Sequence, residues 1–408
     1  MARRIIGLDL GTYALKGALI ETGMRDFRLV RIAERRLPQT SSETALGSVV
    51  STALQELMSD LGGAPDVVVT GLTGERVFSR KLTLPFSDRK KIDSVIGFEL
   101  EGVLPTDIEG LVYDYQVQAA TDDGVEIFAV SAEQSYVGAF LRMLSQANID
   151  PKVVDYEPYS YLNLIGQLPQ ETDRAIAVLD IGHRKTDLCI VVNGEVVVAR
   201  TISRGGHQIT REIAKAFDVE EHEAEALKHQ RGFLALDEQM PTDPNEKRLA
   251  EAIRRGIFPL VRDVHQTLAT SRAATSKGVA TLHICGGGAR LGGLVDYFES
   301  ALGVTVEPLR ISALPFAKGA DLALVEDAGA KALALGLGSA SDKRCSFINF
   351  RRGPFSYAGD FQFIRDRLRW VAIVALIFVA LFSVKALQKY LYLSSTATAQ
   401  KKNLEELT

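Results

Sequence analysis

The sequence predicts an α/β protein of two lobes, followed by a single membrane-spanning helix. Two strand–turn–strand patterns rich in glycine and aspartate lie far apart in the chain, after the apolar runs Arg4 to Leu10 and Ala175 to Leu179. A third apolar run, Val279 to Ile284, ends in three successive glycines. Near the C-terminus, residues 370–384 carry no charged side chain. Short apolar strands separated by helical patterns and glycine turns are typical of α/β architecture.

The first pattern predicts a β-hairpin able to hold a phosphate. Gly7-Leu8-Asp9-Leu10-Gly11-Thr12 ends the first strand, Lys16 follows, and a new strand runs from Leu15 to Glu21. Glycines in such a turn let backbone N–H groups approach a phosphate, and an aspartate can hold Mg²⁺ through water.

The second pattern repeats this arrangement. Asp180-Ile181-Gly182 and Thr186-Asp187 precede a strand from Leu188 to Val192. The third, Ile284-Cys285-Gly286-Gly287-Gly288-Ala289, leaves room for something flat, such as an adenosine, against the backbone. Two phosphate hairpins and one adenosine loop imply ATP. An Asp-x-Gly pair after a strand is also ordinary turn chemistry, so the prediction depends on the order and separation of the three motifs.

Composition agrees with this architecture and excludes some partners. The 408 residues are 46% apolar, enough for two or three domains with sizeable cores. The alanine, leucine and glycine repetition from Gly329 to Gly338 predicts a core helix of the second lobe. A net charge of -4 leaves no basic footprint, which argues against a nucleic-acid partner. The N-terminus, Met1-Ala2-Arg3-Arg4, lacks the apolar region of a signal peptide, so we expect the large domain to be cytoplasmic.

A small subdomain is predicted between the two hairpins, over residues 78–150. Helical spacing of apolar residues runs from Arg89 to Leu100, and a second helix is predicted from Tyr136 to Ala147. Between them, Val112 to Ala119 and Val125 to Ser131 read as strands. This order suits a small sheet with its helices on one face.

A membrane helix is predicted from Leu368 to Leu387. A span needs about 17–25 mostly apolar residues, and this stretch suffices if Arg369 and Lys385 extend toward the head groups. Trp370 lies at one edge, where aromatic side chains favour the membrane–water interface. Residues 388–408 are mostly polar and too short to bury a core of their own.

The order of these motifs resembles the actin, Hsp70 and hexokinase fold, from about residue 3 to 340. Glu225 and Lys228 lie three apart on one helical face, as in a pair that reaches ribose and adenine in that family. The resemblance implies ATP with Mg²⁺ held through water by Asp9 and Asp180. His183-Arg184-Lys185 departs from the family, because bulky cations there could either bind phosphate or fill the space that ATP needs.

By the same resemblance, each predicted nucleotide-binding residue has a place. Those that hold the phosphates from one side are Asp9, Gly11, Thr12 and Lys16, and from the other side Asp180, Gly182 and Thr186. Those that frame the adenosine are Glu225, Lys228, Gly286, Gly287, Gly288 and Ala289. No residue is a clear candidate to orient a water for hydrolysis, and none is assigned a catalytic role.

A narrower resemblance is to the pilus-assembly protein PilM and its division relative FtsA. It rests on Lys90 to Glu101 with Leu104-Pro105 and Asp114-Tyr115, and on Gly205 to Thr210. Ile348 to Phe355 is similar to the short segment of the pilus protein PilN that lies in a groove of PilM. A PilM-like domain fused to such a segment and a membrane span is the layout of GspL, from type II secretion.

This resemblance implies a domain organisation and a partner-binding segment. The predicted parts are an actin-like cytoplasmic domain (1–340, with the inserted subdomain at 78–150 and the second lobe at 175–340), a linker with the PilN-like segment (341–367), the transmembrane helix (368–387) and the start of a periplasmic segment (388–408). The predicted partner-binding residues are Ile348, Asn349 and Phe350, and Ile348 to Phe355 is expected to dock on the actin-like lobe.

The implied function is that of a scaffold and not of an enzyme. In such systems a single-pass protein of the bacterial inner membrane, with its N-terminus in the cytoplasm, recruits a motor ATPase and contacts other platform proteins. It also implies homo-oligomers. The sequence does not choose between a type II secretion system and a type IV pilus machine.

Two alternatives remain open. A sugar-kinase-like phosphotransferase would need a catalytic carboxylate in the cleft between the lobes. An FtsA-like filament ATPase would attach to the membrane by a C-terminal amphipathic helix, whereas Ile377-Phe378-Val379 lies in the middle of an uninterrupted apolar run.

Overall fold

The computed structural model describes residues 3–23, 26–38, 43–102, 107–121, 124–169, 174–322, 326–340 and 345–405. They form two units, Met1–Phe355 and Ser356–Thr408, which are treated separately. The Leu104-Pro105 motif and residues 341–344 of the predicted linker lie outside the described residues.

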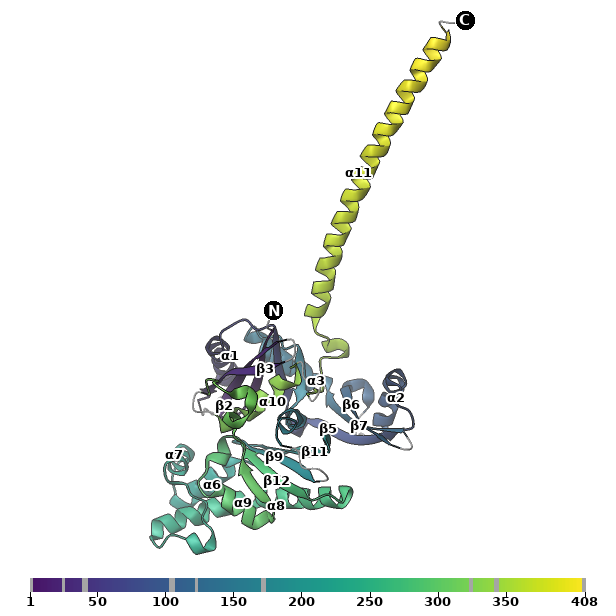
Figure 1. The fold of residues 1–408 in the computed structure, drawn as a ribbon. Coiled ribbons are helices and arrows are strands. Elements are labelled where there is room, and N and C mark those ends of the chain that lie inside the picture. The colour runs from purple at the N-terminus through teal and green to yellow at the C-terminus, as the bar shows by residue number, and fades with distance from the viewer. Residues whose placement is uncertain are drawn as a thin grey trace. The chain divides into compact units, whose positions relative to one another are not determined.

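The sequence predicts two lobes, and in the structure of the first unit each lobe is formed by a five-stranded sheet (Figure 1). Their strand orders are β3-β2-β1-β4-β8 and β11-β10-β9-β12-β13. In each sheet three antiparallel strands are joined to two parallel ones, so the two lobes share one topology. The strands of the first sheet are β1 (Arg3–Leu10), β2 (Ala14–Thr22), β3 (Phe27–Arg36), β4 (Val67–Leu72) and β8 (Val153–Tyr156). Those of the second are β9 (Ala175–Ile181), β10 (Thr186–Val192), β11 (Glu195–Ile202), β12 (Val279–Cys285) and β13 (Thr305–Pro308).

The two predicted hairpins are confirmed. β1 pairs antiparallel with β2, and the register places Asp9 directly opposite Lys16. β9 pairs antiparallel with β10, and here Asp180 is directly opposite Asp187. The two hairpins occupy equivalent positions in the two sheets, because each is formed by the first two strands of its lobe.

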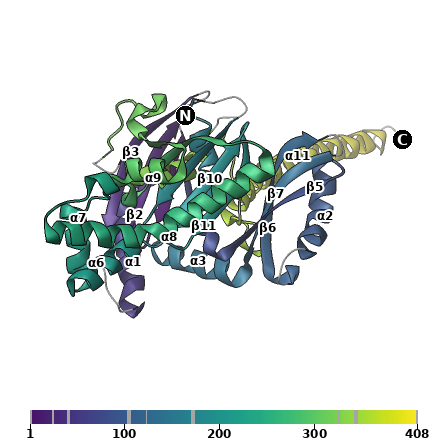
Figure 2. The same cartoon turned by 90° about the horizontal axis from the view of Figure 1, so that it is seen from below.

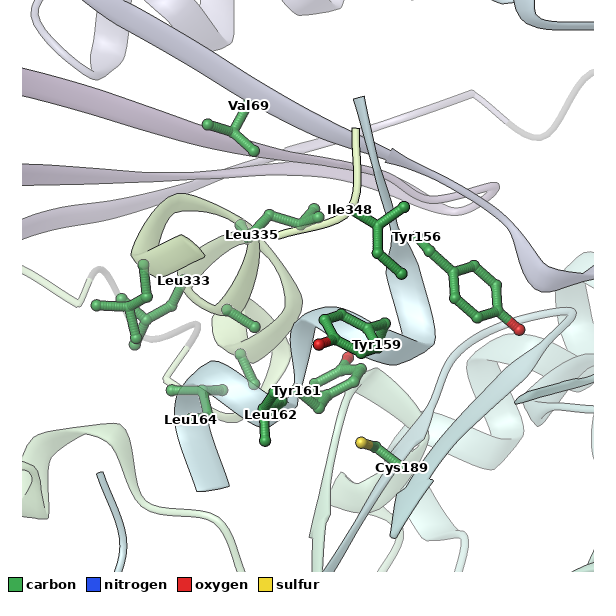
Figure 3. Packing of buried hydrophobic residues seen from close by; sticks show 14 of the residues in the cluster. Val69, Tyr156, Tyr159, Tyr161, Leu162, Leu164, Cys189, Leu333, Leu335 and Ile348 are labelled. Carbon is green, nitrogen blue, oxygen red and sulfur yellow. The ribbon is translucent and has the colours of Figure 1, made fainter. Parts of the chain in front are cut away.

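The alanine-, leucine- and glycine-rich segment forms helix α10 (Ala330–Gly338), but the helix packs on the first lobe and not on the second as expected. Its main contacts are with β1 and β2. Leu333 and Leu335 belong to a buried cluster that also contains Val69 of the first sheet (Figure 3). The approach is close at Gly7, where an added Cβ would lie 2.0 Å from the carbonyl oxygen of Ala332. The chain therefore returns to its first lobe after building the second.

We expect Gly7→Ala to lower the free energy of unfolding by about 3 kcal/mol, because the methyl group would overlap the backbone of α10. Urea unfolding followed by circular dichroism measures this loss. Gly278→Ala is the matched control, since an added Cβ at Gly278 meets nothing within 4 Å. Equal stability of the two variants would contradict the packing of α10 on β1.

The inserted subdomain contains a three-stranded sheet of order β5-β7-β6. The sequence missed one of its strands, and its two helices do not share a face of the sheet as expected. Ile127 and Ala129 pack with the first helix, whereas Phe128 and Val130, on the other face of the same strand, join the core of the main body. The second helix contributes Val137 to that main core. The elements are β5 (Val77–Leu84), β6 (Leu111–Thr121), β7 (Gly124–Glu133), α2 (Arg89–Glu101) and α3 (Gln134–Gln146).

Helices cover the remaining faces of the sheets. The first lobe has α1 (Glu43–Asp60), whereas α4 (Glu157–Ser160) contacts strands of both sheets and α5 (Leu162–Ile165) contacts α10 and the second sheet. The second has α6 (Gly206–Phe217), α7 (Glu221–Arg231), α8 (Pro244–Thr275) and α9 (Leu294–Leu302). Figure 2 shows α8 running across the second sheet, where Ile253, Ile257 and Leu260 are buried in the core of this lobe. The Asp243 carboxylate caps α8 by accepting the N–H groups of Asn245 and Glu246.

The second unit consists of one long helix, α11 (Ala358–Glu405). Within it, Ala372–Ala399 is long and apolar enough to cross a membrane, with a mean hydropathy of 1.9. Among the described residues no other helix meets this test. Apolar side chains such as Phe378 and Phe382 are exposed, as the lipid-facing residues of a span would be.

Candidate functional site

A cavity of about 280 Å³ lies where the two hairpins face each other. This volume is near the lower end of the range for small-molecule sites, roughly 300–1,000 Å³. The cavity is lined by most of the residues that the sequence predicts for nucleotide binding. They are Asp9, Gly11, Thr12, Lys16, Asp180, Gly182, Glu225, Lys228, Gly287 and Gly288.

Three predicted residues do not line this cavity. The hydroxyl of Thr186 is buried and donates to the Arg204 carbonyl oxygen at 2.7 Å, so it is directed away. Gly286 has a φ of 89°, and an added Cβ would lie 2.0 Å from an Asp180 oxygen. Its missing side chain therefore makes room for Asp180 and not for an adenosine. Ala289 packs against the core of the second lobe.

Gly182 reaches the cavity in a different way from the one expected. Its N–H donates to the Lys185 carbonyl oxygen at 2.9 Å and closes the hairpin turn. This N–H group is therefore committed to the turn, whereas the prediction assigned it to a phosphate. The positive charge near this turn comes from the side chains around it and not from this amide.

A buried ammonium group lies at the centre of the site. Lys331, on α10, is 5% exposed, and its Nζ is 2.7 Å from Asp187 Oδ2 and 3.4 Å from Glu157 Oε2. The same Nζ is 3.6 Å from Asp180 Oδ2 and 3.8 Å from Asp9 Oδ1. One cation thus joins four carboxylates that come from both lobes.

The strand register explains why this cation is needed. Asp180 and Asp187 lie directly opposite each other on adjacent strands, and like charges in such a pair repel. Burial raises the pKa of Asp180, and Lys331 opposes that rise. Burial would lower the pKa of Lys331, but the surrounding carboxylates hold it well above its usual value. Lys331 therefore stays charged and stabilises a cluster that would otherwise be strongly repulsive.

Two further ammonium groups complete the cluster. Lys16 Nζ is 3.3 Å from Asp9 Oδ2, as expected from their positions in the β1–β2 register. Lys185 pairs with Glu157. Burial acts to raise the pKa of Asp9, but Lys331 and Lys16 together leave it lowered. Four carboxylates and three ammonium groups thus balance to within one charge.

This arrangement does not fit the predicted Mg²⁺. Asp9 and Asp180 lie where the prediction places them, but Lys331 Nζ is within 3.8 Å of both. A divalent ion bound through water between these two carboxylates would meet a fixed positive charge. Within the described ranges, no group of three or more histidine, cysteine or acidic side chains has a geometry that could hold a metal ion.

The pair predicted to contact the adenosine, Glu225 and Lys228, also lines the cavity. Lys228 Nζ is 2.7 Å from Glu225 Oε2 and donates to Thr210 Oγ1 at 2.8 Å and to the Gly206 carbonyl oxygen at 3.2 Å. Burial lowers the pKa of Lys228, although Glu225 opposes this. His229 and the hydroxyl of Thr210 also bind Glu225. The polar groups of this pair are therefore already satisfied by one another and by Thr210, Gly206 and His229.

Aromatic rings connect the two lobes at the cavity. Tyr13, between β1 and β2, lies with its ring centroid 5.3 Å from that of His183, between β9 and β10. His183 is in turn 5.2 Å from His207. Burial lowers the pKa of His183 to about 4, so this side chain is neutral at pH 7. Of the predicted run of three cations, His183 is therefore an aromatic contact, Lys185 an ion-pair partner, and Arg184 lines the cavity.

The sequence reasoning missed Lys331 and Glu157. Lys331 is the one charged residue within Gly329 to Gly338, and a charge inside a buried apolar helix needs partners. Glu157 directly follows strand β8, much as Asp9 lies near the end of β1 and Asp180 near the end of β9. Both signals were present in the chain.

A second site is formed by residues 346–352, which we call the docking segment. It lies beside β8, the edge strand of the first sheet. The Phe350 N–H donates to the Val154 carbonyl oxygen at 2.9 Å, and the Val154 N–H donates to Asn349 Oδ1 at 3.2 Å. The segment therefore satisfies backbone groups that an exposed sheet edge would leave unpaired.

Two buried carboxylates hold the same segment. Asp155 accepts the N–H of Ile348 at 2.9 Å, and Asp114 accepts the N–H of Asn349 at 2.8 Å. Asp114 also pairs with Arg352 at 2.6 Å. The side chain of Ile348 is fully buried, in the cluster that contains Tyr156 and Leu335 (Figure 3). Ile348 to Phe355 was expected to dock on the actin-like lobe, and in the structure residues 346–352 lie against β8 of the first lobe and, through Asp114, against β6 of the inserted subdomain.

The Asp155 carboxyl should make the stability of this region dependent on pH. Burial raises its pKa well above the usual value, and the nearby Asp114 adds to the rise. The folded state therefore binds a proton that the unfolded state has released, so stability falls as pH increases above about 4. The slope approaches about 1.4 kcal/mol per pH unit. We expect Asp155→Asn to flatten this dependence in urea unfolding from pH 5 to 8, and an unchanged slope would contradict it.

Comparison with known proteins places this geometry in a family. A family profile described as "Type IV pilus assembly protein PilM" matches residues 7–339. The solved structure of a "PilM-PilN type IV pilus biogenesis complex" is similar, with a TM-score of 0.69, 24% sequence identity, and coverage of 83% of this chain and 99% of that one. At this identity the likeness shows the fold, which is the two-lobed actin-like fold.

Curated relatives are more distant. A "Cell division protein FtsA" from Rhizobium meliloti (strain 1021) is 24% identical over 217 residues, which are 48% of this chain and 48% of that protein. One from Staphylococcus epidermidis is 26% identical over 119 residues, 29% of this chain and 25% of that protein. The chain thus spans half or less of the length of these relatives. The matched profile covers both lobes and the cavity between them, and on that basis the chain belongs to the family of type IV pilus assembly proteins PilM.

Proposed function

We propose that this chain is an inner-membrane platform protein of a type IV pilus or type II secretion machine. In this proposal the actin-like domain lies in the cytoplasm, recruits a motor ATPase and contacts other platform proteins. The chain is anchored by α11 as a single-pass protein and forms homo-oligomers. ATP, when bound, occupies the cavity between the hairpins.

The docking segment supports this proposal most strongly. Its Ile348, Asn349 and Phe350 are held by the first lobe through backbone hydrogen bonds and full burial of both apolar side chains. In sequence, residues 353–357 separate the segment from α11. The similar solved structure is a complex of PilM with PilN, and this chain would carry both parts in one polypeptide.

Co-purification with the motor ATPase of the same pilus or secretion system tests the scaffold function. We expect the 408-residue chain, solubilised in a nonionic detergent, to retain this ATPase on an affinity column. The two alternatives have distinct signatures. ATP-dependent pelleting of polymers would indicate an FtsA-like filament, and transfer of phosphate from ATP to a sugar would indicate a kinase. Either signature without motor binding would overturn the proposal.

Calorimetric titration of ATP tests the nucleotide site. Lys16 lines the cavity, and its ammonium would contact a phosphate directly. A hydrogen bond to a charged group contributes about 1.5–3 kcal/mol, so Lys16→Met should weaken ATP binding roughly 10- to 100-fold. Lys215→Met, on the exposed surface of α6, is the control with the same change of charge. Equal affinities for the two variants would place ATP elsewhere.

A further inference from the structure

We propose that Lys331 takes the place of a divalent cation in the cavity, so that phosphate groups bind here through ammonium groups and without Mg²⁺. A single Nζ atom lies within 3.8 Å of carboxylates from Asp9, Glu157, Asp180 and Asp187. These carboxylates come from both lobes, and the ammonium group of Lys331 is the charge-balancing cation that all four share.

Lys331 cannot easily leave this position. Its side chain lines the cavity but is only 6% exposed, and its Nζ is held 2.7 Å from Asp187 Oδ2. The helix that carries it is fixed against β1, because the backbone of Ala332 lies in close contact with Gly7. The positive charge is therefore a permanent part of the site.

A second cation would be poorly accommodated beside it. Mg²⁺ requires octahedral oxygen ligands and keeps several of its waters, whereas each of these four carboxylates already has an ammonium group within 3.8 Å. Its double charge would also lie a few ångströms from a fixed ammonium. The buried lysine thus supplies the compensation that a metal ion would otherwise give.

The same cations can meet a phosphate. Lys16, Lys185 and Lys331 all line the cavity, and each is a donor with no acceptor function. An anion entering the cavity would exchange part of its solvation for these ammonium groups. This step of the inference rests on the proposed nucleotide site, whereas the exclusion of metal ions does not.

Titration with Mn²⁺, followed by the electron paramagnetic resonance signal of the free ion, tests the exclusion of metal. The wild-type chain in a nonionic detergent should bind no Mn²⁺ up to about 1 mM. Lys331→Ala should bind one Mn²⁺ per chain, with an affinity at least about tenfold higher than this 1 mM limit, since four carboxylates then lack their shared cation. Lys185→Ala is the matched control: it also removes an ammonium from the cluster but leaves Lys331 in place, and it should gain nothing.

Three outcomes would overturn the inference. They are a wild-type chain that binds one Mn²⁺, a folded Lys331→Ala that binds no more Mn²⁺ than Lys185→Ala, and wild-type affinity for ATP that increases about tenfold when EDTA is replaced by Mg²⁺. The two wild-type measurements decide the matter if Lys331→Ala does not fold. Failure to bind ATP in either condition would remove the nucleotide site and the phosphate step together, and the Mn²⁺ titration would still judge the exclusion of metal.

Discussion

Replacing Lys331 with methionine should lower the free energy of unfolding of the first unit by about 3–5 kcal/mol, the usual cost of leaving buried charges without their partner. Methionine has a similar length and keeps the packing of the stem, but it removes the charge that faces Asp9, Glu157, Asp180 and Asp187. Urea unfolding of the chain in a nonionic detergent, followed by circular dichroism, measures the loss.

The dependence of this loss on pH distinguishes an electrostatic cause from a packing defect. Lys331 acts to lower the pKa values of Asp9, Glu157 and Asp180, so these pKa values should rise when its charge is removed. Stability of the variant should therefore fall as pH increases, and the difference from wild type should be larger at pH 8 than at pH 5. A cavity defect would give the same difference at both pH values.

Two comparisons control this prediction. Lys215→Met, at a side chain that is 63% exposed, should change stability by less than about 0.5 kcal/mol. Asp187→Asn should restore part of the loss in the Lys331→Met background, because it removes the carboxylate closest to the missing ammonium. Additive losses in the double variant would mean that the two side chains do not interact.

Replacing Phe350 with alanine should cost a similar amount, about 3–5 kcal/mol, through loss of a large buried side chain. Phe350 is 0% exposed, in the core cluster that also holds Ile348. Its backbone N–H donates to the Val154 carbonyl oxygen at the edge of the first sheet. Loss of the side-chain packing should therefore also weaken this hydrogen bond, which covers the sheet edge. The docking segment should then separate from the domain far more often than in wild type.

Limited digestion with trypsin reports this separation directly. Arg351 is protected in the folded protein, since its side chain is 8% exposed and bonded to Asp150. We expect cleavage after Arg351 to be fast in Phe350→Ala and slow in wild type. Phe98→Ala is the matched control, because Phe98 on α2 is 75% exposed and its loss leaves no cavity. Equal cleavage in the two variants would show that Phe350 does not hold the segment.

Much of the fold could be predicted from the chain because it depends on local patterns. The alternation of apolar strands and glycine turns located both hairpins, and their Asp9, Lys16 and Asp180 line the cavity as predicted. The apolar run without charge located the C-terminal helix, although α11 extends from Ala358 to Glu405. Each of these features is set by residues that are neighbours in sequence.

Other features could not be predicted, since they depend on contacts between distant parts of the chain. Helix α10 was recognised as a core helix, but its place on the first lobe depends on the fit between Gly7 and Gly336, which are far apart in sequence. Both helices of the inserted subdomain were predicted on one face of its sheet, which is wrong. The sequence shows that both faces of β7 carry apolar residues, but it does not show which element packs on each face.

The sequence by itself therefore determined the two hairpins, the two lobes, the apolar C-terminal helix and the aspartates that face the cavity. Only the tertiary structure decided how the charges of the site are compensated. A carboxylate at the end of a strand is compatible with a metal ion, a phosphate-bound cation or a lysine, and sequence spacing does not distinguish them. Lys331 follows Asp180 by 151 residues in the sequence, and only the folded chain brings the Lys331 ammonium within 3.6 Å of the Asp180 carboxylate.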